Sequence, residues 1–458
     1  MCGVYRTSLA QVTESKSHFL PTTMPIRFNI KPALQAVTGA LVLSLSLPLL
    51  AADGVGVIGE NDSNTVKFRL MWIDNPTTEA TVGWVQKSGE PGIVHFGKAD
   101  KQRKHHLYAK TQAVHQTVKI KDGTNCFAKL SGLEPDTEYF YVIKDAAGVS
   151  RRLKFHTAPA KAETFTFING GDSRSNRKTR QELNKIAAKL KPLFISFSGD
   201  MVNRATDKEW DTWFTDWQLT ISEDGTIIPI VAHRGNHENK KDAIANEFNT
   251  PDDAYYAFTV GGDLLRYYTL NSEIPAAGAQ SEWLEKDLGK HVSKVTFSVA
   301  GYHKPMRPHV GAKKEGDNPY KWAPIFYKYG MDLAFESDSH CNKRTHPLKP
   351  DVNGEEGFSA AKNDPKATVY TGEGCWGAPL RKANDAKSWT IDCDAFNGFD
   401  WVQVTPTAIH LKTVRFDKDD SAQKVQSVAQ MNSFKTPDGL SIWQAKGGEL
   451  LTIKAKKK

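Results

Sequence analysis

Between residues 65 and 158 the chain consists of short runs in which apolar and polar residues alternate. Turn-forming residues separate the runs, which are TVKFRLMWI, EATVGWVQ, IVHFG, QTVKI, CFAKLSGL, EYFYVIK and RRLKFHTA. Alternation with a period of two buries the side chains on one face of a strand and exposes those on the other. Short strands at this spacing predict an antiparallel, all-β sandwich over residues 60–158.

After Thr157 the pattern changes to near-continuous apolar runs that alternate with amphipathic stretches. These predict strands at residues 165–170, 193–200, 227–232, 294–303, 331–335 and 368–372, and helices at 180–191, 207–221 and 280–291. Strands this apolar fit a sheet that is covered on both faces. The alternation predicts an α/β layered domain, with mixed sheets flanked by helices, over residues 160–430. Residues 431–458 then form a C-terminal extension with a basic tail.

The segment before these two domains has a third pattern. From Met24 a short basic region with Arg27 and Lys31 is followed by the mostly apolar, uncharged residues 33–50 and by two alanines. This order is typical of a secretory signal peptide, with Met24 as the start and residues 1–52 as the leader. The alternative is a membrane anchor, since the apolar stretch is near the minimum length that spans a bilayer. We expect a periplasmic or secreted protein with no stable membrane insertion after cleavage.

Composition and charge narrow the class of partner. The chain has 458 residues, of which 39% are hydrophobic and 11 are tryptophan, so it can bury the cores of two or three domains. Its formal net charge is +8, and no long block of Lys or Arg precedes the terminal KAKKK. Basic and aromatic residues are not interleaved, so we expect no nucleic-acid partner, while a mild basic excess suits an anionic small molecule. The sequence sets no oligomeric state.

The cysteines argue against a thiolate metal site. Five are present, Cys2 falls in the predicted leader, and no Cys-x-x-Cys pair occurs. Disulfides persist in exported proteins. Cys375 and Cys393 are near enough in sequence to pair, but the connectivity of Cys126, Cys341 and these two stays open.

Side chains with metal-ligand chemistry follow five of the predicted strands. They are Asp172, Asp200, Asn236 with His237, His303, and Asp338 with His340. Strand ends at one edge of an α/β sheet line the ligand crevice, and glycines before three of these residues allow sharp turns. Each residue alone is more often structural, but five in order are hard to explain by chance. Carboxylate and imidazole ligands together suit Fe, Zn or Mn, and a central carboxylate such as Asp200 can bridge two ions.

The motifs at these strand ends resemble those of a known protein family. The order Gly-Asp, Gly-Asp-x-Val, Gly-Asn-His-Glu, a later His and a final His resembles the calcineurin-like metallophosphoesterases. The phrases YYAFTVGGDLLRYYTLNS (255–272) and AQSEWLEKDL (279–288) make the chain similar to the purple acid phosphatases in particular. LSGLEPDTEYFYVI (130–143) resembles the fibronectin type III pattern. The resemblance covers most of residues 65–415 and implies a metallophosphoesterase sandwich preceded by an immunoglobulin/fibronectin-like one.

The resemblance also implies a pair of divalent or trivalent metal ions (Fe, Mn or Zn). Its ligands, with Asp200 shared, are Asp172, Asp200 and His340 for the first ion and Asp200, Asn236 and His303 for the second. His237 matches the family's histidine that contacts the substrate or protonates the leaving oxygen. His309 is assigned a second outer-sphere role on its position alone.

Three positions depart from the family pattern. Arg174 stands where the broad pattern has a histidine, and Asn203 stands where purple members have a tyrosine, so no charge-transfer colour is expected. Asp338 stands where the first histidine of Gly-His-x-His binds metal. We keep Asn203 and Asp338 among the candidate ligands, and an aspartate oxygen there favours Mn or Fe over Zn. Two alternatives stay open: the alignment slips so that His346 takes part, or the second site has lost its function.

An arginine accompanies nearly every one of these loops. The four are Arg174, Arg204, Arg234 and Arg307. Guanidinium groups match phosphate oxygens bidentately, so our hypothesis is that two or more of them clamp the phosphoryl group of the substrate. The alternative is that they pair with acidic residues on the loops.

The sequence thus predicts an exported, metal-dependent enzyme that hydrolyses phosphomonoesters of small molecules. The expected mechanism is in-line attack on phosphorus by a metal-bound hydroxide, with His237 assisting the leaving group. One alternative is a phosphodiesterase or nucleotide phosphohydrolase on the same fold. The other is a degenerate protein that binds phosphorylated ligands without turnover.

Overall fold

The computed structural model describes residues 60–314, 316–417 and 421–456. All of them belong to one compact unit, Val55–Lys458. The predicted signal peptide lies outside the described residues. None of the described helices is long and apolar enough to cross a membrane.

The first part of this unit is the predicted β-sandwich. One of its sheets contains β1 (Thr65–Met71), β2 (Ala80–Gln86), β5 (Gln116–Ile120) and β6 (Gly123–Leu130). The other contains β3 (Ile93–Gly97), β4 (Lys110–Gln112), β7 (Glu138–Lys144) and β8 (Leu153–His156). Neighbouring strands within these two groups are antiparallel. Trp84, Tyr141 and Phe155 lie in the core between them, as the alternating pattern requires.

The second part contains two large sheets. The first runs in the order β23 (Leu450–Lys454), β22 (Ala408–Phe416), β21 (Asn397–Val404), β9 (Phe165–Gly170), β10 (Phe194–Phe197) and β11 (Ile230–Ala232). The second runs in the order β12 (Tyr256–Val260), β13 (Leu265–Thr269), β14 (Phe297–Gly301), β15 (Leu333–Glu336), β19 (Val369–Gly372), β16 (Asn342–Thr345) and β20 (Thr390–Asp394). Strands β9, β10 and β11 are parallel to one another, and so are β13, β14, β15 and β19.

The two parts share a sheet. Strand β11 pairs in parallel with β1 of the sandwich, where Met71 lies opposite Ile230. The sheet therefore continues from β11 through β1, β2, β6 and β5 and has ten strands. The domain bounds taken from the sequence stay predictions.

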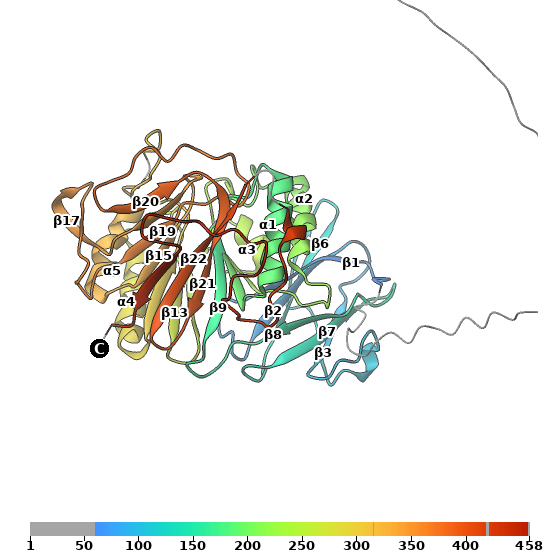
Figure 1. The fold of residues 1–458 in the computed structure, drawn as a ribbon. Helices are drawn as coiled ribbons and strands as arrows, with labels where there is room; N and C mark the ends of the chain where they lie inside the picture. Colours follow the sequence, from blue (N-terminus) through green and yellow to red (C-terminus); the bar gives the residue numbers. More distant parts are fainter. Residues whose placement is uncertain (1–59, 315, 418–420, 457–458) are drawn as a thin grey trace, which may run out of the picture. The chain divides into compact units, whose positions relative to one another are not determined.

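Helices cover the outer faces of the two large sheets (Figure 1). They are α1 (Arg177–Leu190), α2 (Asp207–Trp217) and α3 (Ala243–Phe248) on the first sheet, and α4 (Ala279–His291) and α5 (Ala323–Tyr329) on the second. Leu183 and Trp213 belong to the same buried cluster as Ile195 of β10, and Leu284 belongs to the same buried cluster as Ala300 of β14. Aromatic side chains of both sheets, including Phe167, Phe194, Tyr267 and Phe335, fill the space between them. This helix–sheet–sheet–helix order confirms the predicted α/β layered class.

The smaller elements connect these layers. They are the hairpin of β17 (Leu348–Glu355) and β18 (Phe358–Ala360) and the 3₁₀ helices His105–Leu107, Gln218–Thr220, Val292–Lys294, Pro319–Trp322 and Ala422–Lys424. The four cysteines of the described region, Cys126, Cys341, Cys375 and Cys393, are all free, so the pairing considered for the last two does not form.

Candidate metal centre

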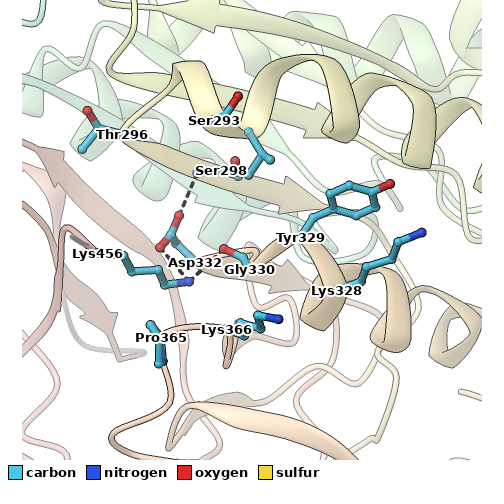
Figure 2. A pocket seen from close by; sticks show the side chains of 11 residues that line it. Ser293, Thr296, Ser298, Lys328, Tyr329, Gly330, Asp332, Pro365, Lys366 and Lys456 are labelled. Atoms are coloured by element: carbon cyan, nitrogen blue, oxygen red, sulfur yellow. Dashed lines mark hydrogen bonds and ion pairs between the residues drawn. The ribbon is translucent and has the colours of Figure 1, made fainter. Parts of the chain in front are cut away.

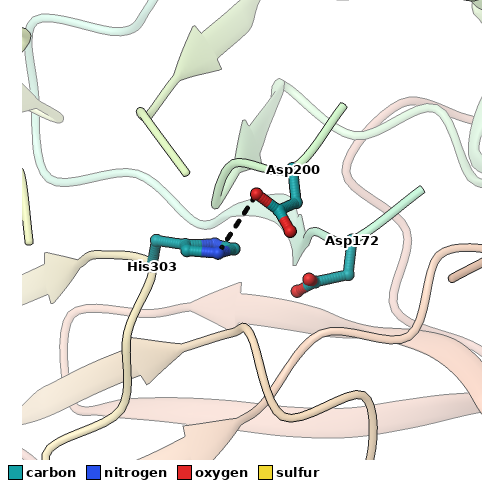
Figure 3. Close-up of side chains that lie close together, drawn as sticks. All are labelled: Asp172, Asp200 and His303. Carbon is teal, nitrogen blue, oxygen red and sulfur yellow. Dashed lines mark ion pairs between the residues drawn. The ribbon is translucent and has the colours of Figure 1, made fainter. Parts of the chain in front are cut away.

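The strand-end residues of both large sheets meet at one place. Asp172 and Asp200 follow the neighbouring parallel strands β9 and β10, and His303 follows β14 of the other sheet. One ligand atom from each of these three buried residues lies within 4.8 Å of the other two (Figure 3). Parallel strands bring their carboxyl ends to the same edge, which accounts for Asp172 lying beside Asp200, and the packing of the two sheets brings His303 to them.

Four atoms that can bind a metal lie close together: the Nε2 of His303 and three side-chain oxygens. This Nε2 lies 3.0 Å from Asn236 Oδ1, 3.3 Å from Asp200 Oδ1 and 3.7 Å from Asp338 Oδ1. The Ser198 carbonyl oxygen lies 2.8 Å from Nδ1 of His303 and can only accept, so Nδ1 donates to it. Nε2 is therefore the nitrogen that faces the three oxygens. Three oxygens and one imidazole nitrogen fit a metal ion at the position predicted for the second ion.

Residues for the first ion lie beside this group. His340 Nε2 is 3.1 Å from Asp172 Oδ1, which is buried and has no hydrogen-bond partner among the described residues. An orphaned buried carboxylate oxygen that faces an imidazole nitrogen is a feature that a cation would satisfy. Asp172 Oδ2 accepts from the backbone N–H of Asp338 at 2.8 Å. Donor atoms for an ion are therefore present here too, but Arg174 also contacts two of the assigned residues, as described below.

Four candidate ligands adopt backbone conformations that are rare for residues other than glycine. Asp172, Asp200, Asp338 and His340 have φ values of 57°, 55°, 69° and 57°. Residues held in the left-handed region cluster at functional sites because the surrounding structure must over-determine them. Four of the seven predicted metal ligands are therefore held in this strained region.

Glu238 connects two of the ligand loops. Its buried carboxylate accepts the backbone N–H groups of Asp200 at 2.9 Å, Met201 at 2.8 Å and Gly235 at 2.8 Å. A side chain on Gly235 would collide with Asp200, so the Gly-Asn-His-Glu motif needs its glycine for this close approach. The motif thus positions Asp200 as well as Asn236.

His237 lies at the open side of the group. Its side chain is 31% exposed, and its Nε2 is 3.8 Å from Asp200 Oδ2. Its Nδ1 donates to the Asn203 carbonyl oxygen at 2.9 Å, so the ring is held with Nε2 directed toward the ligands. This is the placement that a histidine acting on a bound substrate requires.

His309 is placed differently. It is fully buried, with Nδ1 2.9 Å from Glu373 Oε1 and Nε2 2.8 Å from Thr390 Oγ1. Both ring nitrogens are engaged, so the structure gives no support to the outer-sphere role assigned to it. His346 lies in the turn between β16 and β17, and Asp338 is the residue of this region that faces His303.

The arginines divide into two groups. The guanidinium of Arg174 reaches the cluster and contacts Asp200, Asn203 and His340. Arg234 donates to the carbonyl oxygen of Glu238, and Arg204 is exposed. Arg307 donates to the carbonyl oxygen of Glu356 and lies 4.1 Å from the ring centroid of Tyr320. Arg307 also lies 3.5 Å from Asp317 Oδ1, so the alternative of pairing with acidic loop residues describes it better than a phosphate clamp.

Two further parts of the site were not predicted from the sequence. Lys313 Nζ lies 2.6 Å from Asp338 Oδ2, and no local pattern marks this lysine. Gly374 follows β19 with a φ of +76°, and a Cβ there would overlap Asp172 Oδ2. The Gly-Glu-Gly sequence at 372–374 ends a predicted strand just as the ligand motifs do, so that signal was available.

The buried charges explain the electrostatics of the cluster. Burial alone would lower the pKa of His303, but the carboxylates of Asp200 and Asp172 raise it to about 9. Burial would likewise raise the pKa of Asp172, but His303 and His340 hold it at about 2. Burial raises the pKa of Asp200. The carboxylates thus attract positive charge at the place where the donor atoms converge.

A separate hollow of about 300 Å³ lies at the other ends of the second sheet's strands (Figure 2). Asp332, which precedes β15, accepts from the Ser298 backbone N–H at 2.9 Å and pairs with Lys456 Nζ at 3.0 Å. These charged groups stabilise each other within the wall of the hollow. Because Asp338 follows the same strand, the hollow and the metal cluster lie at opposite strand ends.

Comparison with known families agrees with this geometry. The calcineurin-like phosphoesterase model matches residues 169–342, and the purple acid phosphatase N-terminal domain model matches residues 65–157. Residues 169–342 are thus similar to the calcineurin-like phosphoesterases. Within that class its two matched regions follow the order of the purple acid phosphatases, to which it is similar.

Two curated proteins have sequences similar to this chain. An uncharacterized protein of Mycobacterium tuberculosis is 22% identical over 334 residues, which cover 62% of this chain and 62% of that protein. The chain therefore aligns with less than two thirds of that relative. Purple acid phosphatase 15 of Arabidopsis thaliana is 22% identical over 387 residues, or 72% of this chain and 70% of that one.

Among solved structures, a purple acid phosphatase from yellow lupin (Lupinus luteus) seeds matches with a TM-score of 0.67 and 16% identity, covering 80% of this chain and 74% of that one. PhoD matches with a TM-score of 0.58 and 11% identity, covering 87% of this chain and 94% of that one. At this identity the two structures establish the shared fold.

Proposed function

We propose that the protein is a metal-dependent hydrolase of phosphoric ester bonds that acts on phosphomonoesters of small molecules. The observation that carries the proposal is the convergence of Asp200, Asn236, His303 and Asp338 on one point, in a chain similar to the calcineurin-like phosphoesterase class. That class uses a dinuclear metal centre. Fe, Mn or Zn suits these oxygen and nitrogen donors.

The residues divide the work of binding and positioning. Asp200, Asn236, His303 and Asp338 would hold an ion at the second position, and Asp172, Asp200 and His340 are the donors of the first. A bound ion supplies Lewis-acid stabilisation of phosphoryl oxygens. Glu238 keeps Asp200 in place through the backbone N–H groups of both loops.

His237 is the proposed proton donor. Its Nε2 faces the cluster while part of the ring reaches solvent, so the protonated ring can donate from Nε2 to the leaving ester oxygen. General acid help of this kind contributes roughly 10²–10⁴-fold. Arg174, next to the same face, is positioned to receive phosphoryl oxygens.

Export is part of the proposal. The basic region, apolar stretch and small residues of the leader support cleavage near residue 52 and a periplasmic or secreted location. N-terminal sequencing of protein recovered from the culture supernatant and the periplasmic fraction tests this. An intact leader on membrane-bound protein would support the anchor instead.

Hydrolysis assays test the activity. Protein loaded in turn with Mn²⁺, Zn²⁺ or Fe is assayed with p-nitrophenyl phosphate and with bis-p-nitrophenyl phosphate. We expect faster release from the monoester and loss of release in Asp200→Asn, which removes charge from the centre of the cluster. Preference for the diester would support the phosphodiesterase alternative. Binding of inorganic phosphate without any release would support the non-catalytic alternative, for which Arg174 among the ligands is the motivating observation.

A further inference from the structure

The guanidinium of Arg174 lies among the residues assigned to the first metal position. Its Nε donates to Asp200 Oδ2 at 3.1 Å, one terminal nitrogen donates to Asn203 Oδ1 at 3.3 Å, and the other lies 3.2 Å from His340 Nε2. The side chain is 11% exposed, so water competes little for these contacts. One fixed cation therefore engages an Asp200 oxygen and the His340 nitrogen that a first ion would use.

The contact with His340 is incompatible with an ion on the same nitrogen. His340 Nδ1 lies 2.7 Å from the Pro379 carbonyl oxygen, which only accepts, so Nδ1 carries the proton. Nε2 then has a single lone pair, which either accepts the Arg174 N–H or binds a metal. A guanidinium keeps its proton in proteins, so Arg174 does not become neutral to admit the ion.

The charges at the centre also favour one ion over two. Asp172, Asp200 and Asp338 bring three carboxylates, while Arg174 and Lys313 bring two fixed cations. A single divalent ion converts the remaining negative charge into a positive one that attracts a phosphate ester. A second would add further positive charge to a buried cluster, where repulsion is poorly screened.

We propose that Arg174 takes the place of the first metal ion, so that the protein holds one ion, at the second position. The proposal deepens the proposed function and rests on its metal centre. Three of the five N–H donors of Arg174 are used on the protein, which leaves two to bind phosphoryl oxygens. Asp172 Oδ1, without a hydrogen-bond partner among the described residues, remains as part of a latent ion site.

Metal stoichiometry tests the proposal without relying on turnover. The full chain is loaded with excess Mn²⁺ or Zn²⁺, freed of unbound metal by gel filtration, and measured by elemental mass spectrometry. We expect one ion per chain in the wild type and two in Arg174→Met and Arg174→Ala, because both variants release Asp200 Oδ2 and His340 Nε2. Arg177→Ala is the matched control: Arg177 lies three residues after Arg174 but pairs with Asp216, so its loss should leave one ion.

The outcomes separate this proposal from the proposed function. Two ions in the wild type overturn the proposal and leave a metal-dependent enzyme standing. No ion overturns both. One ion in the wild type and one in both Arg174 variants overturns the proposal, because the arginine then excludes nothing.

A second measurement covers the case in which the Arg174 variants do not fold, as judged by circular dichroism. Asp172→Asn changes a ligand that serves the first position, so the wild-type content of one ion should persist. A fall to no bound ion in folded Asp172→Asn would place the single ion at the first position and overturn the proposal.

Discussion

Single residues at this site carry unusual backbone and packing constraints. Asp172 combines a positive φ with a buried carboxylate, and the residue that leaves room for that carboxylate, Gly374, comes from a different strand end. Gly374 matters because it has no side chain and so leaves space for the Asp172 carboxylate. Steric fit therefore positions the candidate ligands as much as hydrogen bonds do.

Gly374→Ala is predicted to displace the Asp172 carboxylate, because the added Cβ would overlap Oδ2. The same oxygen accepts the backbone N–H of Asp338, a candidate ligand of the second ion position, so the shift should reach that ligand. A displacement of about 1 Å at such a site costs roughly 10²-fold, so we expect kcat/KM for p-nitrophenyl phosphate to fall by that factor. Gly89→Ala is the control. It has the same strained φ, +77°, but its Cβ would meet nothing within 4 Å, so the activity should not change. Equal activity of the two variants would contradict the steric argument.

Asp400 on β21 gives a pH-dependent prediction. Burial raises its pKa to about 6, although the hydroxyls of Thr413 and Thr371 and the charge of Arg344 act in the opposite direction. The folded protein binds this proton more tightly than the unfolded chain, whose reference value is 3.8. The stabilisation is therefore present below about pH 4 and is lost as the pH rises through about 6.

Asp400→Asn should remove that loss. Relative to the wild type, its free energy of unfolding should rise by on the order of 3 kcal/mol between pH 4 and pH 7.5. Urea denaturation of both proteins at the two pH values measures this. A constant difference between wild type and variant would show that the carboxylate is not destabilised by burial.

At the scale of elements, the ligand loops are held by one another more than by their strands. Strands β10 and β11 are only four and three residues long, and the loops that follow them are connected through Glu238. Short parallel strands define where the chain turns. The buried acceptor then sets the separation of Asp200 and Asn236.

Glu238→Ala is predicted to leave four buried backbone N–H groups without an acceptor. Each orphaned donor costs about 1–3 kcal/mol, so we expect a loss of at least about 4 kcal/mol in the free energy of unfolding and weaker metal retention. Glu209→Ala is the comparison, since Glu209 accepts from Asn203 and Arg204 at a partly exposed site where water can replace it. If urea denaturation shows similar losses for both, Glu238 has no special structural role.

At the scale of the described molecule, the β-sandwich and the layered part share more than a linker. Arg69 of β1 is buried and donates to the Glu247 carbonyl oxygen, and Trp72 lies 5.6 Å from Phe194 of β10 between ring centroids. The core between the two large sheets continues into the sandwich. The sandwich therefore completes the sheet on which Asp200 and Asn236 are carried.

Deletion of residues 60–158 should accordingly destabilise the metal centre as well as the sheet. It removes the partner strand of β11 and exposes an apolar sheet edge, which promotes association between chains. We expect oligomers or precipitate on size-exclusion chromatography and an earlier thermal transition. A monomeric, fully active fragment would show that the shared sheet is dispensable.

Several strands of the layered part were not predicted from the sequence, and β16 and β22 were missed for two different reasons. The four residues of β16, Asn342–Thr345, are all buried although none is apolar, because Lys343 pairs there with Glu336 and Glu373. Hydrophobic periodicity cannot detect such a strand. Strand β22, Ala408–Phe416, does alternate, so its absence from the prediction was an omission rather than a physical limit.

The sequence by itself determined the layered fold and five strand ends with ligand chemistry, because an apolar run followed by glycine and a polar residue is a local pattern. The tertiary structure alone decided which of four similar arginines enters the cluster and that His309 is engaged elsewhere. A strand's end depends on its own residues. The surroundings of a long side chain depend on loops from other strands, such as those that bring Asn203 and His340 to Arg174.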